Sequence, residues 1–246
     1  MGKTTTAINL SASLAEAEKK VLVIDIDPQG NSTSGFGIEK DEQENTIYEL
    51  LLGECEIEDC MIVTEFDDLT IIPSNVNLAA AGIELVGIEE KEYILKKALD
   101  KVRDKYDFII IDCPPSLSML TINAMCAADT VLVPIQCEYY ALEGLTQLIH
   151  TINLVKERLN PELEMEGVVF TMYDARTNLS LQVVENVKNN LNQEIYKTII
   201  PRNVRLAEAP SHGMPVNKYD SKSTGAESYR LLAEEVIHRG EDDEWL

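Results

Sequence analysis

Hydrophobic residues occur along this chain in two patterns that follow each other in turn. Short apolar runs rich in β-branched side chains are typical of strands buried on both faces of a parallel sheet. Between these runs, apolar residues recur at the three- and four-residue spacing of amphipathic helices. The predicted strands cover residues 21–25, 69–73, 108–112, 130–134, 166–171 and 194–200, and the predicted helices cover residues 5–17, 46–52, 76–86, 91–105, 138–159, 179–191 and 225–238.

This alternation predicts an α/β fold, a doubly wound and mostly parallel sheet with helices on both faces. The chain of 246 residues is long enough for one large domain, and no internal repeat or low-complexity linker divides residues 1–246. We expect polar loops at 32–45 and 201–210. An acidic segment at 54–68 is expected to wrap a sheet edge, and an acidic tail at about 240–246 is expected to be frayed.

The amino end carries the second half of a phosphate-binding loop. Gly2-Lys3-Thr4 completes the pattern G-x-x-x-x-G-K-[ST] and leads into the first predicted helix. Gly2 lets the backbone approach a phosphate, Lys3 offers an ammonium to the β/γ oxygens, and the Thr4 hydroxyl can bind Mg²⁺. The same tripeptide also suits an ordinary helix N-terminus, so its interpretation depends on the motifs that follow.

Two predicted strands end in carboxylates. Asp25 and Asp27 follow the first apolar run and precede Pro28, and Asp112 closes the run at 108–112. Open α/β sheets bind their ligands at the carboxyl ends of such strands. Asp112 has the position of a Walker B aspartate, which holds the Mg²⁺ shell. The segment around Asp27 is equally compatible with a polar turn that Asp-Pro initiates.

Composition limits the classes of function. Hydrophobic residues make up 45% of the chain, and no apolar run reaches the roughly 20 residues that span a bilayer. No secretory signal is visible, so we expect a cytoplasmic protein. The net charge of -22 excludes wrapping of nucleic acid by the whole surface, and any DNA contact needs a local basic patch. The five cysteines lack C-x-x-C spacing, which favours free thiols over zinc ligands or disulfides.

Three ordered motifs, G-K-T-T-T, D-I-D-P-Q-G-N and I-I-I-D-C-P-P-S, resemble those of the ParA/Soj family of chromosome- and plasmid-partitioning ATPases. That family lies within the ParA/MinD class of deviant P-loop ATPases. The similarity covers nearly the whole chain, including residues 174–178, 200–205 and 209–213. It implies a P-loop NTPase fold, Mg²⁺-dependent ATP hydrolysis and a homodimer formed with ATP. It also implies binding of nucleoid DNA without sequence preference and a ParB-like partner that stimulates hydrolysis.

The resemblance implies roles for residues at matching positions. Gly2, Lys3, Thr4 and Thr5 would bind the phosphates, with Lys3 neutralising the β/γ-phosphate charge. Thr4 would also bind Mg²⁺, and Asp112 would hold the metal through water.

The resemblance also implies how water and base are recognised. Asp27 would orient or activate the attacking water, and Asp25 would support its loop from the strand end. Pro201 and Asn203 lie in the segment that cradles adenine in the family, and Asn203 is the candidate for base recognition. Phosphoryl transfer of this kind depends mainly on positioning and charge stabilisation.

The chain departs from the family at its amino end. The family loop reads K-G-G-V-G-K-T-T and follows the first strand of the sheet, whereas Met1 here directly precedes Gly2. The first strand, half of the phosphate loop and the lysine that reaches the partner's phosphates are therefore expected to be missing. A start codon placed too late explains this better than a truncated copy, because the downstream motifs are intact. We expect the printed chain to bind nucleotide poorly and to expose strand edges.

Three arginines match positions where the family contacts DNA. Arg176 lies in the D-A-R-T-N segment, Arg205 follows P-R-N, and Arg202 either contacts DNA or braces the adenine loop. Phosphate contacts usually come from such side chains. The alternative is that these arginines pair with nearby acids such as Asp174 and Glu208.

Other functions suit the sequence less well. A MinD-like protein that binds membranes needs a basic amphipathic helix at its carboxyl end, and here Glu234, Glu235 and the acidic tail would repel anionic lipid. A relative of the nitrogenase iron protein would need cluster ligands, but Cys126 and Cys137 lack the motif context and are expected to pack as small apolar residues. A catalytically impaired copy that acts as an interaction module is a further alternative.

Overall fold

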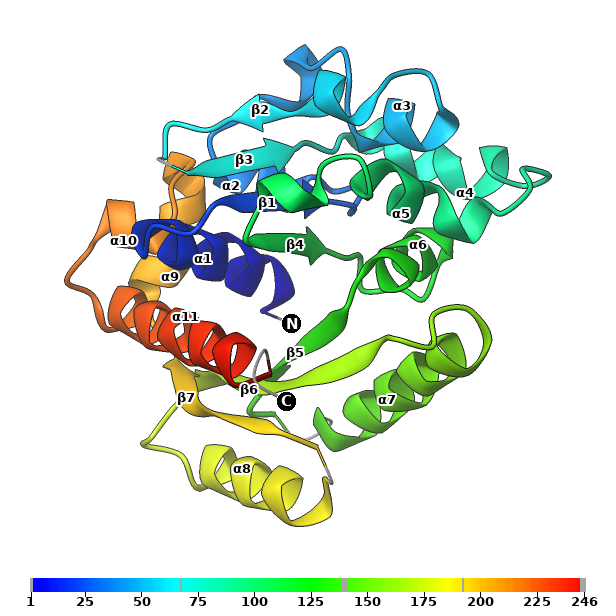
Figure 1. Cartoon of the computed structure of the whole chain (residues 1–246). Coiled ribbons are helices and arrows are strands. Elements are labelled where there is room, and N and C mark those ends of the chain that lie inside the picture. The colour runs from blue at the N-terminus through cyan, green and yellow to red at the C-terminus, as the bar shows by residue number, and fades with distance from the viewer. Residues whose placement is uncertain (1, 67, 139–140, 192, 244–246) are drawn as a thin grey trace.

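The computed structural model describes residues 2–66, 68–138, 141–191 and 193–243 (Figure 1). Its strands are β1 (Val21–Asp25), β2 (Ile62–Val63), β3 (Leu69–Ile72), β4 (Phe108–Asp112), β5 (Thr130–Gln136), β6 (Glu164–Tyr173) and β7 (Ile195–Pro201). Its α-helices are α1 (Lys3–Glu16), α2 (Asn31–Gly35), α3 (Ile47–Leu52), α4 (Ala81–Glu84), α5 (Ile94–Leu99), α6 (Met119–Ala127), α7 (Ala141–Arg158), α8 (Asn178–Asn190), α9 (Val204–Glu208), α10 (Val216–Tyr219) and α11 (Thr224–Asp243).

The strands form two sheets with helices on both faces. The first has the order β2-β3-β1-β4, in which β1 runs parallel to β3 and β4 while β2 is antiparallel to β3. The second has the order β5-β6-β7 and is parallel throughout. The architecture is therefore the α/β arrangement of mostly parallel strands with helices on both faces that the alternation predicts. The acidic segment that is predicted to wrap a sheet edge contains β2, which is the short edge strand of the first sheet.

A gap separates the two sheets. One edge of β4 and one edge of β5 pair with no other described strand. Both strands line a cavity of about 1170 Å³, which Lys3 and Thr6 of α1 also border. Figure 1 shows the first turn of α1 between the two sheets. The cavity explains why the apolar residues of β4 before Asp112 are only half-buried, although the sequence predicts a strand buried on both faces.

Three hydrophobic clusters hold the layers together. One packs α1 and α11 against one face of the first sheet and extends to Val169 of β6 and Tyr196 of β7, so it joins the two sheets. A second packs α3, α5 and α6 on the opposite face of the first sheet. A third packs α7 and α8 against the second sheet and contains Cys126 and Cys137, both buried as expected.

Several predicted boundaries are wrong. The helices expected at 76–86 and 91–105 are each broken into short 3-10 and α-helical pieces. The sequence pattern does not predict α6, because this helix has buried residues on several of its sides and therefore lacks a clear helical period of apolar and polar positions. The loops expected at 32–45 and 201–210 contain α2 and α9. The expected frayed tail is wrong as far as Asp243, where α11 ends, and residues 244–246 lie outside the described part. No described helix has the length and apolar character needed to cross a membrane.

Candidate active site

The first turn of α1 presents unpaired backbone donors. Gly2 caps the helix in the left-handed region, with φ of 113°, and no side chain caps this end. The first backbone bond of the helix runs from the Thr6 N–H to the Gly2 carbonyl, so the N–H groups of Lys3, Thr4 and Thr5 have no partner within the helix. These donors and the helix dipole favour an anion at this end.

Gly2 is required at this position for two reasons. Its positive φ disfavours residues with a side chain. A Cβ atom here would also lie 2.9 Å from the Thr171 hydroxyl oxygen of β6, which is closer than van der Waals contact allows. The second sheet therefore presses directly on the turn that opens α1.

Asp112 lies at the carboxyl end of β4, opposite Asp25 in the parallel register of β1 and β4. Both carboxyl groups are buried. The Ser32 hydroxyl donates to Asp112 Oδ2 at 2.7 Å, whereas the buried Oδ1 atom has no hydrogen-bond partner in the described structure. An unpaired buried carboxylate oxygen needs an explanation, because leaving it unmatched costs free energy.

Asp25 is held by three donors. The Thr33 N–H and the Thr33 hydroxyl each donate to Asp25 Oδ2 at 2.8 Å, and the Asp27 N–H donates to Oδ1 at 3.2 Å. The Thr33 hydroxyl oxygen in turn accepts the Ser74 N–H at 2.9 Å. Asp25 therefore fixes the loop that carries Asp27, the support that the family resemblance implies.

Asp27 lies at the start of that loop with little exposure. Its Oδ1 atom accepts the Gln29 N–H at 2.9 Å, and its carbonyl oxygen accepts the Ser74 hydroxyl at 2.8 Å and the Gly30 N–H at 2.8 Å. No described residue donates to its Oδ2 atom. The loop is thus fixed through its backbone, and one carboxylate oxygen of Asp27 is available for another partner.

The buried carboxyl groups titrate above their ordinary range. Burial raises the pKa of Asp25 to about 7, the charge of Asp112 adds to this, and the donors from Thr33 act against it. Burial also raises the pKa of Asp112, while the hydroxyls of Ser32 and Thr4 and the Lys3 ammonium favour its charged form. Lys3 and Asp112 also line the same cavity between the two sheets.

The raised pKa of Asp25 predicts a pH-dependent stability of the protein without metal or nucleotide. Because the folded state binds this proton more tightly than the unfolded state, the stabilisation is fully present below the ordinary pKa of 3.8 and is lost as the pH rises to about 7. We expect the free energy of unfolding in urea to fall between about pH 4.5 and about pH 7.5, and Asp25→Asn to reduce that slope. An unchanged slope in the variant would contradict this assignment.

The side chains around Asp112 fit Mg²⁺. Mg²⁺ prefers oxygen ligands and is usually held by one or two carboxylates together with substrate phosphates. The unpaired Asp112 Oδ1 atom and the neighbouring Thr4 hydroxyl supply such oxygens. No three His, Cys, Asp or Glu side chains of the described residues gather into a larger metal site. This donor set therefore suits a metal that a bound phosphate completes.

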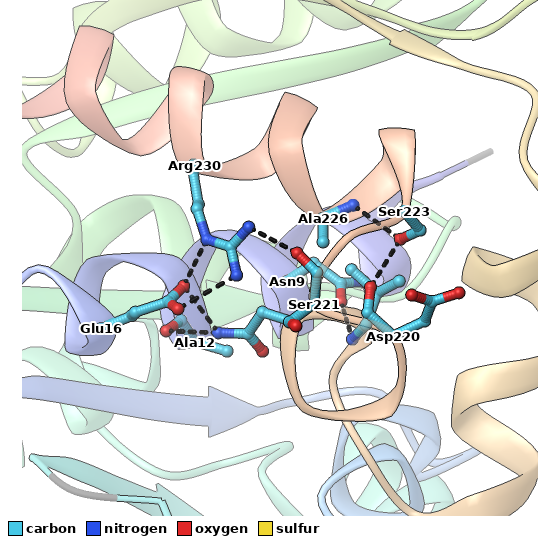
Figure 2. A network of polar contacts seen from close by, with 10 residues as sticks. Asn9, Ala12, Glu16, Asp220, Ser221, Ser223, Ala226 and Arg230 are labelled. Atoms are coloured by element: carbon cyan, nitrogen blue, oxygen red, sulfur yellow. Dashed lines mark hydrogen bonds and ion pairs between the residues drawn. The ribbon is translucent and has the colours of Figure 1, made fainter.

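Helix α10, which follows α9, fixes the position of α1 by hydrogen bonds from Val216 and Asn217 (Figure 2). The Val216 N–H donates to Asn9 Oδ1 at 2.7 Å, and Asn9 Nδ2 donates to the Thr5 carbonyl oxygen at 2.7 Å. Asn9 is buried, and both its amide oxygen and its amide nitrogen have a hydrogen-bond partner. The Asn217 side chain donates to the Ala12 carbonyl oxygen at 3.2 Å one turn further along α1.

Helix α11 holds α1 at two more points. The Tyr229 and Thr6 hydroxyls share a buried hydrogen bond of 3.2 Å. Arg230 donates to both Glu16 oxygens, at 2.8 and 3.1 Å, and to the Ser221 carbonyl oxygen at 2.8 Å. Figure 2 shows Arg230 reaching from α11 between Glu16 and Ser221. These contacts restrain the helix whose first turn carries Lys3 and Thr4.

Loss of the Asn9 amide should therefore destabilise the fold. We expect Asn9→Ala to lower the free energy of unfolding by about 2 kcal/mol, because the Val216 N–H then stays buried without a partner. Asn190→Ala is the matched control, since that amide bonds only to the Asn186 carbonyl oxygen at an exposed site, and it should change stability by less than about 0.5 kcal/mol. Urea denaturation measures both variants.

The predicted adenine segment is occupied by contacts within the protein. Asn203 caps α9, with its Oδ1 atom accepting the Arg205 N–H at 2.8 Å and its Nδ2 atom donating to the Thr224 hydroxyl at 2.7 Å. Pro201 ends β7 opposite Tyr173 of β6. The structure thus gives Asn203 a capping role, and its recognition of a base stays a prediction.

Two of the three predicted DNA-binding arginines pair with acids. Arg176 donates to both oxygens of Asp174, at 2.7 and 2.9 Å, and holds the pKa of Asp174 below its ordinary value. Arg205 pairs with Glu208 at 2.8 Å and with Asp220 at 3.1 Å. The alternative of pairing with nearby acids is therefore observed.

These arginines nevertheless remain accessible. The Arg176 side chain is 87% exposed, and the Arg202 side chain makes no ion pair with the described residues. Exposed ion pairs contribute only about 0–1 kcal/mol, so a phosphate can replace the acid at small cost. DNA contact by the three arginines stays a prediction.

Comparison with known proteins gives consistent matches. The sequence profile of the AAA domain family matches residues 1–165. The chain is 55% identical over 240 residues to the sporulation initiation inhibitor protein Soj of Bacillus subtilis, covering 98% of this chain and 95% of that protein. It is 53% identical over 239 residues to the chromosome partitioning protein ParA of Myxococcus xanthus, covering 97% and 84%.

Solved structures show the same fold. The structure is similar to that of the cobyrinic acid a,c-diamide synthase of Mycobacterium smegmatis with bound ATP analog and magnesium, with a TM-score of 0.86 at 35% identity over 98% of this chain and 91% of that chain. It is also similar to the cell division ATPase MinD of Pyrococcus furiosus, with a TM-score of 0.80 at 27% identity over 96% and 93%.

Proposed function

Because the chain belongs to the ParA/Soj family of partitioning ATPases, we propose that it binds and hydrolyses ATP with Mg²⁺ and thereby controls a homodimer on DNA. The observation that supports this proposal is that Lys3, the first residue of α1, and Asp112 line the same cavity. The N–H groups that open α1 have no partner within the helix, and the Asp112 Oδ1 atom has none among the described residues. An anion with an accompanying divalent cation satisfies all of them at once.

In this proposal the residues have separate tasks. The N–H groups of Lys3, Thr4 and Thr5 and the Lys3 ammonium hold the phosphates, and Gly2 gives the backbone access to them. Thr4 and Asp112 hold Mg²⁺, which supplies charge stabilisation when bound.

Two further tasks complete the site. Asp27 orients the attacking water through its free carboxylate oxygen, since its loop is fixed by Asp25 and Ser74. Pro201 and Asn203 would lie beside the adenine, and Asn203 would then exchange its contact with Thr224 for one with the base.

The cellular role follows the relatives. We propose a cytoplasmic protein that associates with the nucleoid, segregates DNA and is stimulated by a ParB-like partner. Sequence-independent contact with phosphates by Arg176, Arg202 and Arg205 would provide the DNA binding despite the net charge of -22.

Arginine variants test this role. We expect Arg176→Ala and Arg205→Ala to weaken retention of the ATP-bound protein on random duplex DNA equally for all sequences. Each variant should also lower the slope of log affinity against log salt by about 1, because one phosphate is no longer neutralised. Retention can be measured by filter binding over a salt series.

The matched control for these variants is Lys97→Ala, because Lys97 is another exposed cation, paired with Glu90 on a different part of the surface. It should leave both affinity and salt slope unchanged. Equal retention of all the variants would contradict the arginine surface.

A further inference from the structure

Two of the five cysteines lie against each other. The Cys55 and Cys60 sulfur atoms are 3.2 Å apart, although both are thiols in this structure. Cys55 is half-buried in the turn that follows α3, and Cys60 ends a short 3-10 helix (Ile57–Cys60) and is buried. Cys60 Sγ also donates to the Thr46 carbonyl oxygen at 3.3 Å. No other two cysteines among the described residues make such a contact.

The local structure holds this pair in place. Gly53 ends α3 with φ of 73°, which turns the chain sharply before Cys55. The start of the 3-10 helix is fixed by the Glu56 N–H, which donates to Asp59 Oδ2 at 3.1 Å, and by the Asp59 N–H, which donates to the Glu56 carbonyl oxygen at 3.1 Å. The Thr46 carbonyl, which accepts the Cys60 thiol, belongs to the residue that caps α3. Cys55 is therefore positioned by the turn that follows α3, and Cys60 by the 3-10 helix and by the residue that precedes α3.

We propose that Cys55 and Cys60 form a reversible disulfide with hydrogen peroxide, a neutral hydroperoxide, as the oxidant. The Cys55 thiolate attacks one peroxide oxygen, which breaks the O–O bond, forms a sulfenic acid and, with a proton, releases water. The Cys60 sulfur then attacks Cys55 Sγ, the S–S bond forms, and the sulfenic oxygen leaves as a second water with the Cys60 proton. The two sulfur atoms are oxidised by two electrons in total, and the peroxide is reduced to two waters.

Geometry assigns the order of the two thiols. Cys55 is the more accessible of the two, so it meets the oxidant, and the buried Cys60 resolves the sulfenic acid. The sulfur atoms need to approach from 3.2 Å to the disulfide length of about 2.05 Å. A turn between two short helices permits a movement of this size without disturbing a sheet.

The charge around the pair selects the oxidant. Burial raises the pKa of Cys55, as do the charges of Glu49, Glu54 and Asp59, while the Cys60 thiol lowers it. Burial likewise raises the pKa of Cys60. The same acids repel anionic reagents, so an uncharged hydroperoxide should react in preference to oxidised glutathione, which is an anionic disulfide.

Mass spectrometry of the folded full chain tests the proposal. The chain is treated with hydrogen peroxide, free thiols are alkylated, and trypsin releases residues 41–91, which contain both cysteines. We expect this peptide to lose two hydrogen atoms and to escape alkylation, whereas Cys113, Cys126 and Cys137 stay alkylated. Cleavage after Glu56, between the two cysteines, should leave the halves linked until a reductant is added.

Two variants and a second oxidant complete the experiment. In Cys60→Ser, peroxide should carry Cys55 on to sulfinic acid because no resolving thiol is present. In Cys55→Ser, Cys60 should stay alkylatable after unfolding. Oxidised glutathione should act more slowly than peroxide on the unaltered chain. Full alkylation of residues 41–91 after peroxide, or linkage only after the protein is unfolded, would overturn the proposal.

Discussion

Lys3→Ala should weaken ATP binding by roughly a hundredfold, equivalent to about 3 kcal/mol. Lys3 borders the cavity between the two sheets and favours the charged form of Asp112, so its ammonium lies where the proposed phosphates and metal meet. Hydrogen bonds to charged groups are the strong ones, and an ammonium on a phosphate is among them. Titration of the protein with ATP and Mg²⁺, followed by calorimetry, gives the affinity.

Two further variants make this prediction specific, one that keeps the charge of Lys3 and one that removes a different lysine. Lys3→Arg keeps the positive charge but replaces a compact ammonium by a planar fork, so it should recover part of the affinity. Lys20→Ala removes an exposed cation that precedes β1, far along the chain from the start of α1, and should bind ATP as the unaltered protein does. Unchanged affinity in Lys3→Ala would remove Lys3 from the phosphate site, and with it the strongest support for the proposed function.

The strands that carry this site could be predicted from the sequence. The apolar runs of β1 and β4 have high β-propensity and no competing helical period, so local preference and burial favour the same element. The parallel pairing of β1 with β4 then places Asp25 opposite Asp112. Carboxylates at the ends of neighbouring parallel strands must meet at one sheet edge, and this part of the site follows from topology alone.

The polar groups that support the carboxylates could not be predicted in the same way. Ser32 and Thr33 lie in a segment predicted as a polar loop, yet both are buried and donate to Asp112 and Asp25. The contact from Val216 to Asn9 joins residues 207 positions apart. A buried Asn in the middle of a helix is the one signal the sequence offers, because such a residue needs a specific partner.

Asn203 shows a different limit of the sequence. The motif predicts a position near a base, but Asn after a strand and before a helix is also a strong N-cap, and the structure uses it in that way. The separation of the sheets is different, because the sequence does predict exposed strand edges. One edge each of β4 and β5 pairs with no other described strand, and a cavity lies between the two strands.

Asp27→Asn should reduce the rate of ATP hydrolysis by about 10²- to 10⁴-fold while leaving ATP affinity nearly unchanged. The substitution keeps the volume of the side chain and the acceptor for the Gln29 N–H, so the loop that Ser74 fixes should stay in place. Only the charge on the free carboxylate oxygen is lost, and in the proposed function that charge orients and polarises the attacking water. Phosphate release under saturating ATP measures the rate, and the titration used for Lys3 measures the affinity.

Two further substitutions make the Asp27 result specific. Asp104→Asn removes an exposed carboxylate after α5 and should hydrolyse ATP at the unaltered rate. Asp25→Asn disturbs the donors from Thr33, so it should change the pH dependence of stability together with activity. Loss of hydrolysis in Asp27→Asn with stability and affinity retained separates a residue that acts on water from one that holds the loop. An unchanged rate of hydrolysis in Asp27→Asn would instead mean that another group orients the attacking water, because the negative charge of Asp27 would then not be needed.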